Sequence, residues 1–130
     1  MYVLDTNTLI YFFKGEGNVA ENFLSKSPKD IAIPSIVLYE LETGIRKSNY
    51  PLKRIRQLKD LTSIIKILSF GKKEAEVSAK IRANLEEKGT PIGPYYILIA
   101  GIALYNNCIL VTRNLKEFKR IDDLSMENWY

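Results

Sequence analysis

Four polar residues, far apart in the sequence, have the side chains to carry out chemistry together: Asp5, Glu40, Tyr96 and Asn114. The chain contains no histidine at all. That absence excludes Ser–His and Cys–His catalysis and every metal site that uses a histidine ligand. Any chemistry is left to carboxylates, lysine, tyrosine and hydroxyl groups, and an oxygen-only metal site favours hard cations such as magnesium or manganese.

Each of these residues also has an ordinary structural interpretation. Asp5 can cap the helix that follows it. Glu40 and its neighbour Glu42 can be carboxylates on the solvent side of a helix. Asn114 can be a turn residue, and Tyr96 can fill space at the end of a core helix. No single position decides between structure and function, so the argument depends on whether the positions converge.

Size and composition predict one soluble domain, residues 1–130. Hydrophobic residues make up 46% of the chain and charged residues 26%, which is typical of a globular protein able to bury a core. The single cysteine, Cys108, excludes an internal disulfide and a cysteine-based zinc site, and it favours a reducing cytoplasm. The start "MYVLDTNTLIYFFK" lacks the features of a signal peptide, and no apolar run approaches the roughly 20 residues of a membrane span.

The net charge of +4 is unevenly distributed along the chain. Residues 46–82 contain eleven Lys or Arg and only three acidic residues, while the flanking parts are acidic. A basic middle of this kind suits a polyanion lying across one face, with cation-binding carboxylates elsewhere. Solvated helix faces are the competing interpretation of the same charges.

Apolar patterns predict strands that alternate with helices. The expected strands cover residues 2–5, 30–34, 64–70 and 108–112, and the expected helices cover residues 6–15, 18–26, 34–47, 51–63, 72–89 and 95–107. The tail is expected to form a short helical turn and a small strand at 121–125. This alternation predicts an α/β fold with a mainly parallel central sheet flanked by helices.

Local signals refine these elements. Thr6 or Asn7 is the expected cap of the first helix, and Ser35 that of the helix after the second strand. Gly89 is expected to end the long helix before it. In the helix at 51–63 an apolar stripe is expected on one face, formed by Leu52, Ile55, Leu58 and Leu61.

Sites in open α/β sheets form outside the carboxyl ends of the strands. Asp5 ends the first strand, and Asn114 closely follows the strand at 108–112. Glu40 lies about a turn and a half into the helix after the second strand, and Tyr96 lies in the first turn of a buried helix. We therefore expect these four residues to meet in one pocket at the edge of the sheet.

The chain resembles the PIN-domain ribonucleases, and more closely the VapC-type toxins of toxin–antitoxin pairs. The segments that carry the resemblance are "VLDTNTLIYFFKG", "PSIVLYELETGIRKS", "GTPIGPYYILIAGIAL" and "ILVTRNLKEFKRIDDLSMENW". They follow the order of the family and extend over essentially the whole chain. The resemblance implies a PIN-like fold, a homodimer, a VapB-type antitoxin partner, and cleavage of tRNA or another structured RNA with Mg²⁺ or Mn²⁺.

The resemblance also implies a role for each site residue. Asp5 matches a metal-binding acid at the end of the first strand, Glu40 a second acid, and Asn114 a fourth polar group, with the hydroxyl of Thr112 in support. Lys and Arg of the basic middle would hold the RNA backbone. Position 96 is expected to carry a third metal-binding carboxylate, but this chain has Tyr96.

A phenol is neutral near neutral pH, since its pKa is about 10, and it is a poor magnesium ligand. Our hypothesis is that Tyr96 inactivates the nuclease, either as a change selected during production or as decay in a natural homologue. Reading the genomic codon distinguishes the two, because Asp and Tyr codons differ by one base.

Two other functions stay open from the sequence. The chain can be a non-catalytic PIN-like module that binds RNA or a protein. It can also be an α/β protein that handles a small molecule or a phosphate, although it has no Gly-rich nucleotide-binding loop. An antitoxin segment would cover the site, and the aromatic residues Tyr11, Phe12, Phe13 and Tyr39 are candidates for its groove.

Overall fold

The short apolar runs of the sequence form strands in the computed structural model, which describes all 130 residues. The strands are β1 (Tyr2–Leu4), β2 (Ile31–Pro34), β3 (Lys66–Leu68), β4 (Ile109–Val111) and β5 (Met126–Glu127). The helices are α1 (Thr6–Lys14), α2 (Val19–Leu24), the 3-10 helix η1 (Pro28–Asp30), α3 (Ser35–Arg46), α4 (Pro51–Thr62), α5 (Lys72–Glu87), α6 (Pro94–Tyr105) and α7 (Leu115–Phe118).

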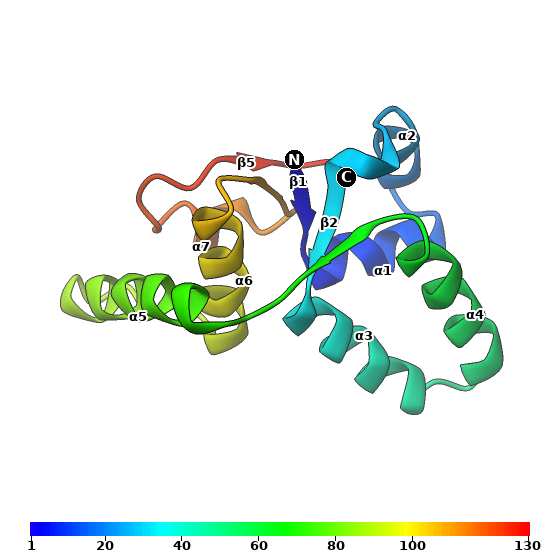
Figure 1. The fold of residues 1–130 in the computed structure, drawn as a ribbon, viewed down its shortest axis with the longest axis horizontal. Helices are drawn as coiled ribbons and strands as arrows, with labels where there is room; N and C mark the ends of the chain where they lie inside the picture. The colour runs from blue at the N-terminus through cyan, green and yellow to red at the C-terminus, as the bar shows by residue number, and fades with distance from the viewer.

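The five strands form one sheet in the order β3-β2-β1-β4-β5, and every neighbouring pair is parallel (Figure 1). The expected α/β fold with a mainly parallel sheet flanked by helices is therefore confirmed. β1 lies at the centre, where Val3 is paired with Ala32 of β2 on one side and with Leu110 of β4 on the other. The direction in which the chain adds strands reverses at β1, so the carboxyl ends of β1 and β4 meet where ligand sites form in such sheets.

Helix α6 is buried along most of its length because it packs against α5 and against the sheet. The two helices approach closely at Gly101, where a β-carbon would collide with the side chain of Ser78 on α5. The hydroxyl of Ser78 is buried there without a hydrogen-bond partner. This tight contact fixes α6, and thereby fixes Tyr96 in its first turn.

Two of the expected helix caps are wrong. Asp5, not Thr6 or Asn7, is the N-cap of α1, and its carboxylate accepts a hydrogen bond from the backbone amide of Thr8 at 2.9 Å. Pro34 occupies the N-cap position of α3, so Ser35 is its first helical residue instead of its cap. In both cases the helix begins directly at the carboxyl end of a strand, with no intervening loop.

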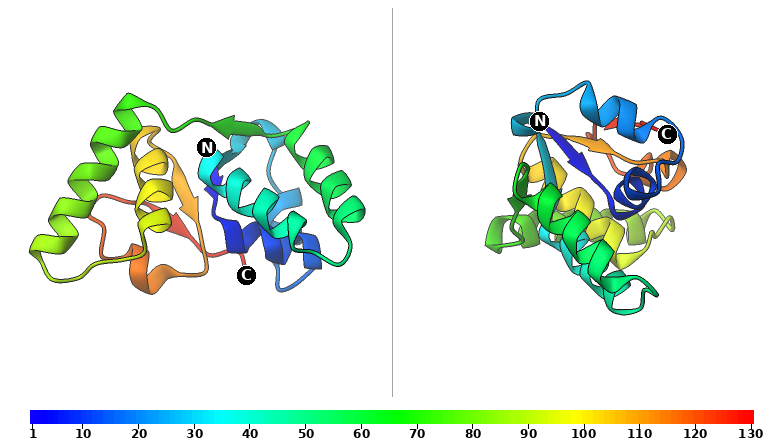
Figure 2. Two further views of the ribbon diagram at one scale, coloured as in Figure 1. Left: turned by 90° about the horizontal axis from the view of Figure 1, so that it is seen from below. Right: turned by 90° about the vertical axis from the view of Figure 1, so that its right-hand side faces the viewer.

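Helix α4 is only half-covered. Leu58 and Leu61 are buried as expected, but 80% of Leu52 and 46% of Ile55 remain exposed. The apolar stripe is therefore only partly confirmed, because the first half of α4 extends beyond the elements it packs against. Helices α4 and α5 lie at opposite ends of the molecule (Figures 1 and 2). The basic residues of α4 and those of α5 therefore lie at opposite ends, with β3 between them.

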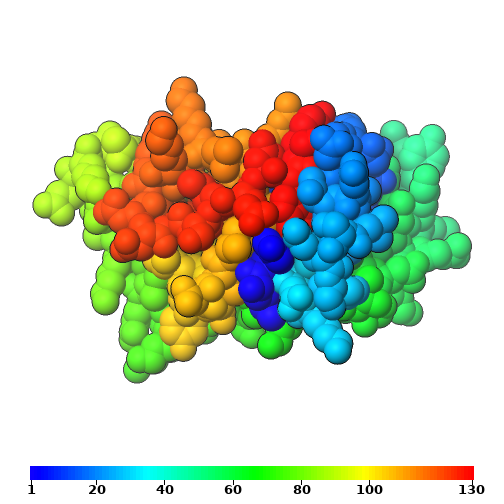
Figure 3. Space-filling model, turned by 90° about the horizontal axis from the view of Figure 1, so that it is seen from above, coloured from blue at the N-terminus to red at the C-terminus, as the bar shows by residue number.

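The end of the chain lies next to α2 (Figure 3), and the ring of Tyr130 packs against Tyr11 of α1. The backbone amide of Asn18 donates to the carbonyl of Tyr130 at 2.6 Å, and the side chain of Asn22 donates to the carbonyl of Trp129 at 3.0 Å. The short helical turn of the tail is confirmed as α7, but the small strand lies at Met126–Glu127, not at 121–125. No helix has both the length and the apolar character needed to cross a membrane.

Candidate active site

Asp5 directly follows β1 and so lies at the carboxyl edge of the sheet. It is 3% exposed, and both carboxylate oxygens accept hydrogen bonds. Oδ1 accepts from the backbone amide of Thr8, and Oδ2 accepts from the hydroxyl of Thr112 at 2.6 Å. The carboxylate is therefore held in one orientation by α1 and by the residue that follows β4, which is distant in sequence.

Thr112 connects Asn114 to this carboxylate. While its hydroxyl donates to Asp5, the same oxygen accepts from the backbone amide of Asn114 at 2.9 Å. The backbone amide of Asp5 donates to the carbonyl of Val111 at 3.1 Å, which aligns the ends of β1 and β4. Thr112 thus has the supporting position that the resemblance implied. Asn114 is connected to Asp5 only through Thr112.

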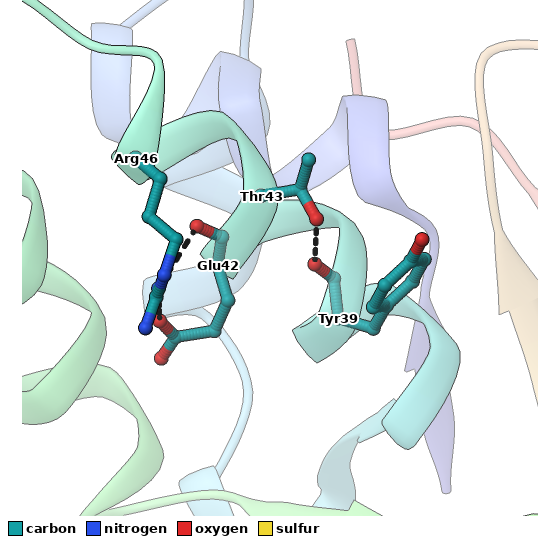
Figure 4. Close-up of polar contacts among 4 residues, drawn as sticks. All are labelled: Tyr39, Glu42, Thr43 and Arg46. Carbon is teal, nitrogen blue, oxygen red and sulfur yellow. Dashed lines mark hydrogen bonds and ion pairs between the residues drawn. The ribbon is translucent and has the colours of Figure 1, made fainter.

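Glu40 also turns toward this edge. The hydroxyl of Thr6, the residue after Asp5, donates to Oε1 of Glu40 at 2.7 Å. Glu42, two residues along α3, instead pairs with Arg46 at 2.9 Å on the outer surface of the helix (Figure 4). Of the two glutamates, Glu42 is the solvent-facing carboxylate, and Glu40 is the one that lies against the residue after Asp5.

Tyr96 lies among the acids. Its ring is half-buried and packs edge-on against Phe118, with the ring centres 5.4 Å apart. Burial raises the pKa of the phenol, and the negative charges of Glu117, Asp5 and Glu40 raise it further. The phenol therefore stays protonated and neutral at physiological pH, next to three carboxylates. The structure brings Asp5, Glu40 and Tyr96 together, as expected from the sequence.

Glu117 was not expected at the site. It is half-buried on α7, three residues after Asn114, and its charge acts on Tyr96 more strongly than those of Asp5 and Glu40 do. The available signal was its spacing, since one helical turn puts residues three apart on the same face. A four-residue helix is too short for its face to be predicted from apolar periodicity.

The donors at this edge are oxygen atoms, which are the ligands that magnesium and manganese prefer. Yet no group of three or more His, Cys, Asp or Glu side chains is arranged to hold a metal ion. Tyr96 stands at the position expected to carry a third carboxylate, and it contributes a neutral oxygen. The residues present therefore do not fit the divalent-cation site that the resemblance implied.

The pKa of Asp5 leads to a stability prediction. Burial raises this pKa, and the hydrogen bonds from Thr112 and Thr8 lower it by less than burial raises it. Because the folded-state pKa lies above the unfolded one, ionisation of Asp5 opposes folding. The ionised carboxylate lowers the free energy of unfolding. This effect is absent below the pKa of Asp5 in the unfolded chain, and it develops as the pH rises through the pKa of Asp5 in the folded chain. Asp5→Asn is thus expected to raise the melting temperature by a few degrees at neutral pH, and by less in acid.

Thermal unfolding of both proteins between about pH 4 and about pH 8 measures this difference. The control is Asp60→Asn, which changes an exposed aspartate on α4 and should leave the pH dependence as it is in the unchanged chain. A lower melting temperature of Asp5→Asn at neutral pH would show that the hydrogen bonds to the carboxylate outweigh the cost of its burial.

A hollow of about 290 Å³ lies beside the acids, between α1, α3 and α4. Glu40 is at one side of it and two cations, Lys14 and Arg54, are on its wall. Its other lining residues are Ile10, Phe13, Leu41, Gly44, Ile45, Ser48 and Leu58. Of the four aromatic residues expected to form a groove, only Phe13 lines this hollow. Tyr11 instead packs against Tyr130.

Comparisons with known proteins agree with this arrangement. Residues 2–124 match the model of the PIN domain family. The chain is 40% identical to ribonuclease VapC2 of Rickettsia felis over 131 residues, which cover 99% of this chain and 98% of that protein. It is 35% identical to the tRNA(fMet)-specific endonuclease VapC of Salmonella typhimurium over 128 residues, which cover 98% of this chain and 97% of that protein.

Solved structures show the same similarity in three dimensions. The chain superimposes with a TM-score of 0.91 and 38% identity on a chain of the crystal structure of VapBC2 from Rickettsia felis bound to a DNA fragment from its promoter. It also superimposes with a TM-score of 0.92 and 36% identity on a chain of DNA-bound VapBC from Salmonella typhimurium. In both cases the match covers 99% of this chain and 98% of the other.

Proposed function

From its membership of the PIN domain family, and within it of the VapC ribonucleases, we propose that this chain is the endoribonuclease toxin of a VapBC-type toxin–antitoxin pair, and that Tyr96 impairs its catalysis. The observation that carries the proposal is the neutral phenol among Glu117, Asp5 and Glu40. Such a cluster of carboxylates is costly to assemble without a cation, which supports a site built for one.

The proposal gives each acid a role toward RNA. Asp5, held by two hydrogen bonds, is the central acid of the site. Glu40, oriented by Thr6, is the second ligand or the group that positions a water molecule. Asn114 orients a ligand or a water. The substrate is tRNA or another structured RNA, and magnesium or manganese is the cofactor once position 96 carries a carboxylate.

A VapB-type antitoxin is the proposed protein partner, and the similarity to VapBC complexes supports it. We propose that a segment of the antitoxin lies in the hollow between α1, α3 and α4, because the hollow reaches Glu40 and a segment in it would cover the acids. Pairing of two toxin copies and a cytoplasmic location are further parts of the proposal.

Gly44→Arg tests this location. A β-carbon on Gly44 meets no atom within 4 Å, so α3 tolerates a side chain there, while an arginine would fill the hollow. The expected result is a loss of antitoxin affinity of about tenfold or more, with an unchanged melting temperature. Calorimetric titration with the purified antitoxin measures it, and Ala83→Arg on the exposed face of α5 is the control. If Gly44→Arg binds the antitoxin with unchanged affinity, the antitoxin does not bind in this hollow.

A non-catalytic PIN-like module that binds RNA or a protein is the second candidate. The absence of a three-acid group able to hold a metal favours it for the chain as it stands. Cleavage of a panel of tRNAs by the unchanged chain and by Tyr96→Asp, with and without divalent cations, separates the two. Cation-dependent cleavage by the variant supports the impaired nuclease, whereas binding without cleavage by both proteins supports the module.

A further inference from the structure

Two exposed tyrosines lie at the rim of the acidic site. Tyr39 on α3 is 55% exposed and Tyr95 on α6 is 43% exposed, and neither belongs to the hydrophobic core. Their rings meet edge to face with centres 5.9 Å apart and planes at 74°, and their hydroxyls are 3.4 Å apart. The pair therefore joins α3 to α6 across the surface of the molecule.

The pair lies at the entrance to the site. Tyr39 directly precedes Glu40, and Tyr95 directly precedes Tyr96. The hydrogen bond with Tyr39 raises the pKa of the Tyr95 hydroxyl, and the negative charge of Glu40 raises it slightly further. Figure 4 shows the ring of Tyr39 projecting from α3 away from the outer surface pair of Glu42 and Arg46.

The geometry of the two rings leaves flat aromatic surface available. An edge-to-face contact occupies one face of one ring only, so the pair does not cover its remaining faces. Exposed aromatic faces bind unpaired nucleobases by stacking, and removal of such a ring weakens binding by about 5- to 150-fold per base. Phosphates, in contrast, are repelled by the neighbouring carboxylates, so a base suits this rim better than the RNA backbone does.

We propose that Tyr39 and Tyr95 form a stacking platform for an unpaired nucleobase of the RNA at the rim of the acidic site. This inference rests on the proposed function as an RNA-directed site and adds how a single strand is positioned there. It makes both tyrosines positioning residues. It also predicts a preference for single-stranded loops over fully paired helices, since only unpaired bases can stack on the rings.

The test measures binding and does not depend on cleavage. A short single-stranded RNA that contains the fluorescent base 2-aminopurine is titrated with the unchanged chain and with the Tyr39→Ala and Tyr95→Ala variants. Each variant is expected to bind about 5- to 150-fold more weakly and to quench the fluorescent base less. Tyr39→Phe and Tyr95→Phe keep the ring and are expected to bind within about twofold of the unchanged chain.

Tyr105→Ala is the matched control, because Tyr105 is 46% exposed at the opposite end of the same helix α6. It should leave the affinity unchanged. A second arm replaces the reporter base by an abasic nucleotide, after which the unchanged chain and the two alanine variants should bind equally weakly. Equal melting temperatures of all variants would confirm that the fold is intact.

Four results overturn the inference. Alanine variants that bind the RNA as tightly as the unchanged chain would show that no base stacks on the rings. A dimer of the unchanged chain that dissociates in the alanine variants, measured by sedimentation, would show that the pair is a contact between two copies. If the unchanged chain binds no RNA but Tyr96→Asp cleaves it, the proposed function stands without the platform. If the unchanged chain binds no RNA and Tyr96→Asp cleaves none, both the platform and the proposed function are wrong.

Discussion

Tyr96→Asp is expected to raise cation-dependent RNA cleavage by about a hundredfold or more over the chain as it stands, comparable to the effect of one strong electrostatic contact in a catalytic site. The reason is local. The phenol is neutral and half-buried among Glu117, Asp5 and Glu40, and its ring occupies space beside them. An aspartate would remove the ring and add a carboxylate beside those of Glu117, Asp5 and Glu40, giving oxygen ligands of the kind that a divalent cation prefers.

Cleavage of tRNA is measured with magnesium, with manganese, and with a chelator in excess. Tyr96→Ala is the matched control, because it removes the ring without adding a charge, and it should remain inactive. Stability provides a second readout, since an added acid beside three others should lower the melting temperature until a cation is supplied. A variant that neither cleaves RNA nor gains stability from manganese would refute the assignment of position 96.

The second large effect is expected at the acids around Tyr96. In the Tyr96→Asp background, Glu40→Gln and Glu117→Gln are each expected to lower cleavage by about a hundredfold, since each removes one charge from the cluster while keeping the shape of the side chain. Glu40 is oriented by Thr6, and Glu117 lies near enough to act on the Tyr96 phenol.

Glu42→Gln in the same background is the control for both. Glu42 lies two residues beyond Glu40 on α3, but it pairs with Arg46 on the outer surface, so its removal should change cleavage by less than about twofold. Initial rates on one tRNA substrate at saturating manganese measure all three variants. If Glu117→Gln behaved like Glu42→Gln, the acid of α7 would be a neighbour of the site without a part in it.

Much of the central architecture follows from the sequence for a physical reason. Buried parallel strands are continuous apolar runs, and "IAIP" and "CILV" are runs of this kind that became β2 and β4. Polar residues at the ends of such runs are forced to one edge of the sheet, so the convergence of Asp5 with Thr112 was predictable. Glu40 was expected to turn toward this edge because its neighbours Leu38 and Leu41 are apolar, and its carboxylate does accept a hydrogen bond from Thr6 there.

Other features depend on packing that a single sequence does not contain. Glu117 lies on a helix of four residues, too short for periodicity to show its face. The basic residues at 46–82 are continuous in sequence but divided in space, because β3 carries the chain from α4 at one end to α5 at the other. Leu52 is exposed although it belongs to the apolar stripe of α4. Its exposure depends on how α4 packs against α3, and a single sequence does not contain that packing.

The central position of β1 has a consequence for the order of events during protein synthesis. β4, the last strand that pairs with β1, is synthesised after every helix except α7, and Thr112, which fixes Asp5, follows it directly. A shortened translation product therefore lacks the hydroxyl that orients the central acid and the partner strand that aligns it. With this fold, an active toxin becomes dangerous to the RNA of its own cell only when its translation is almost finished.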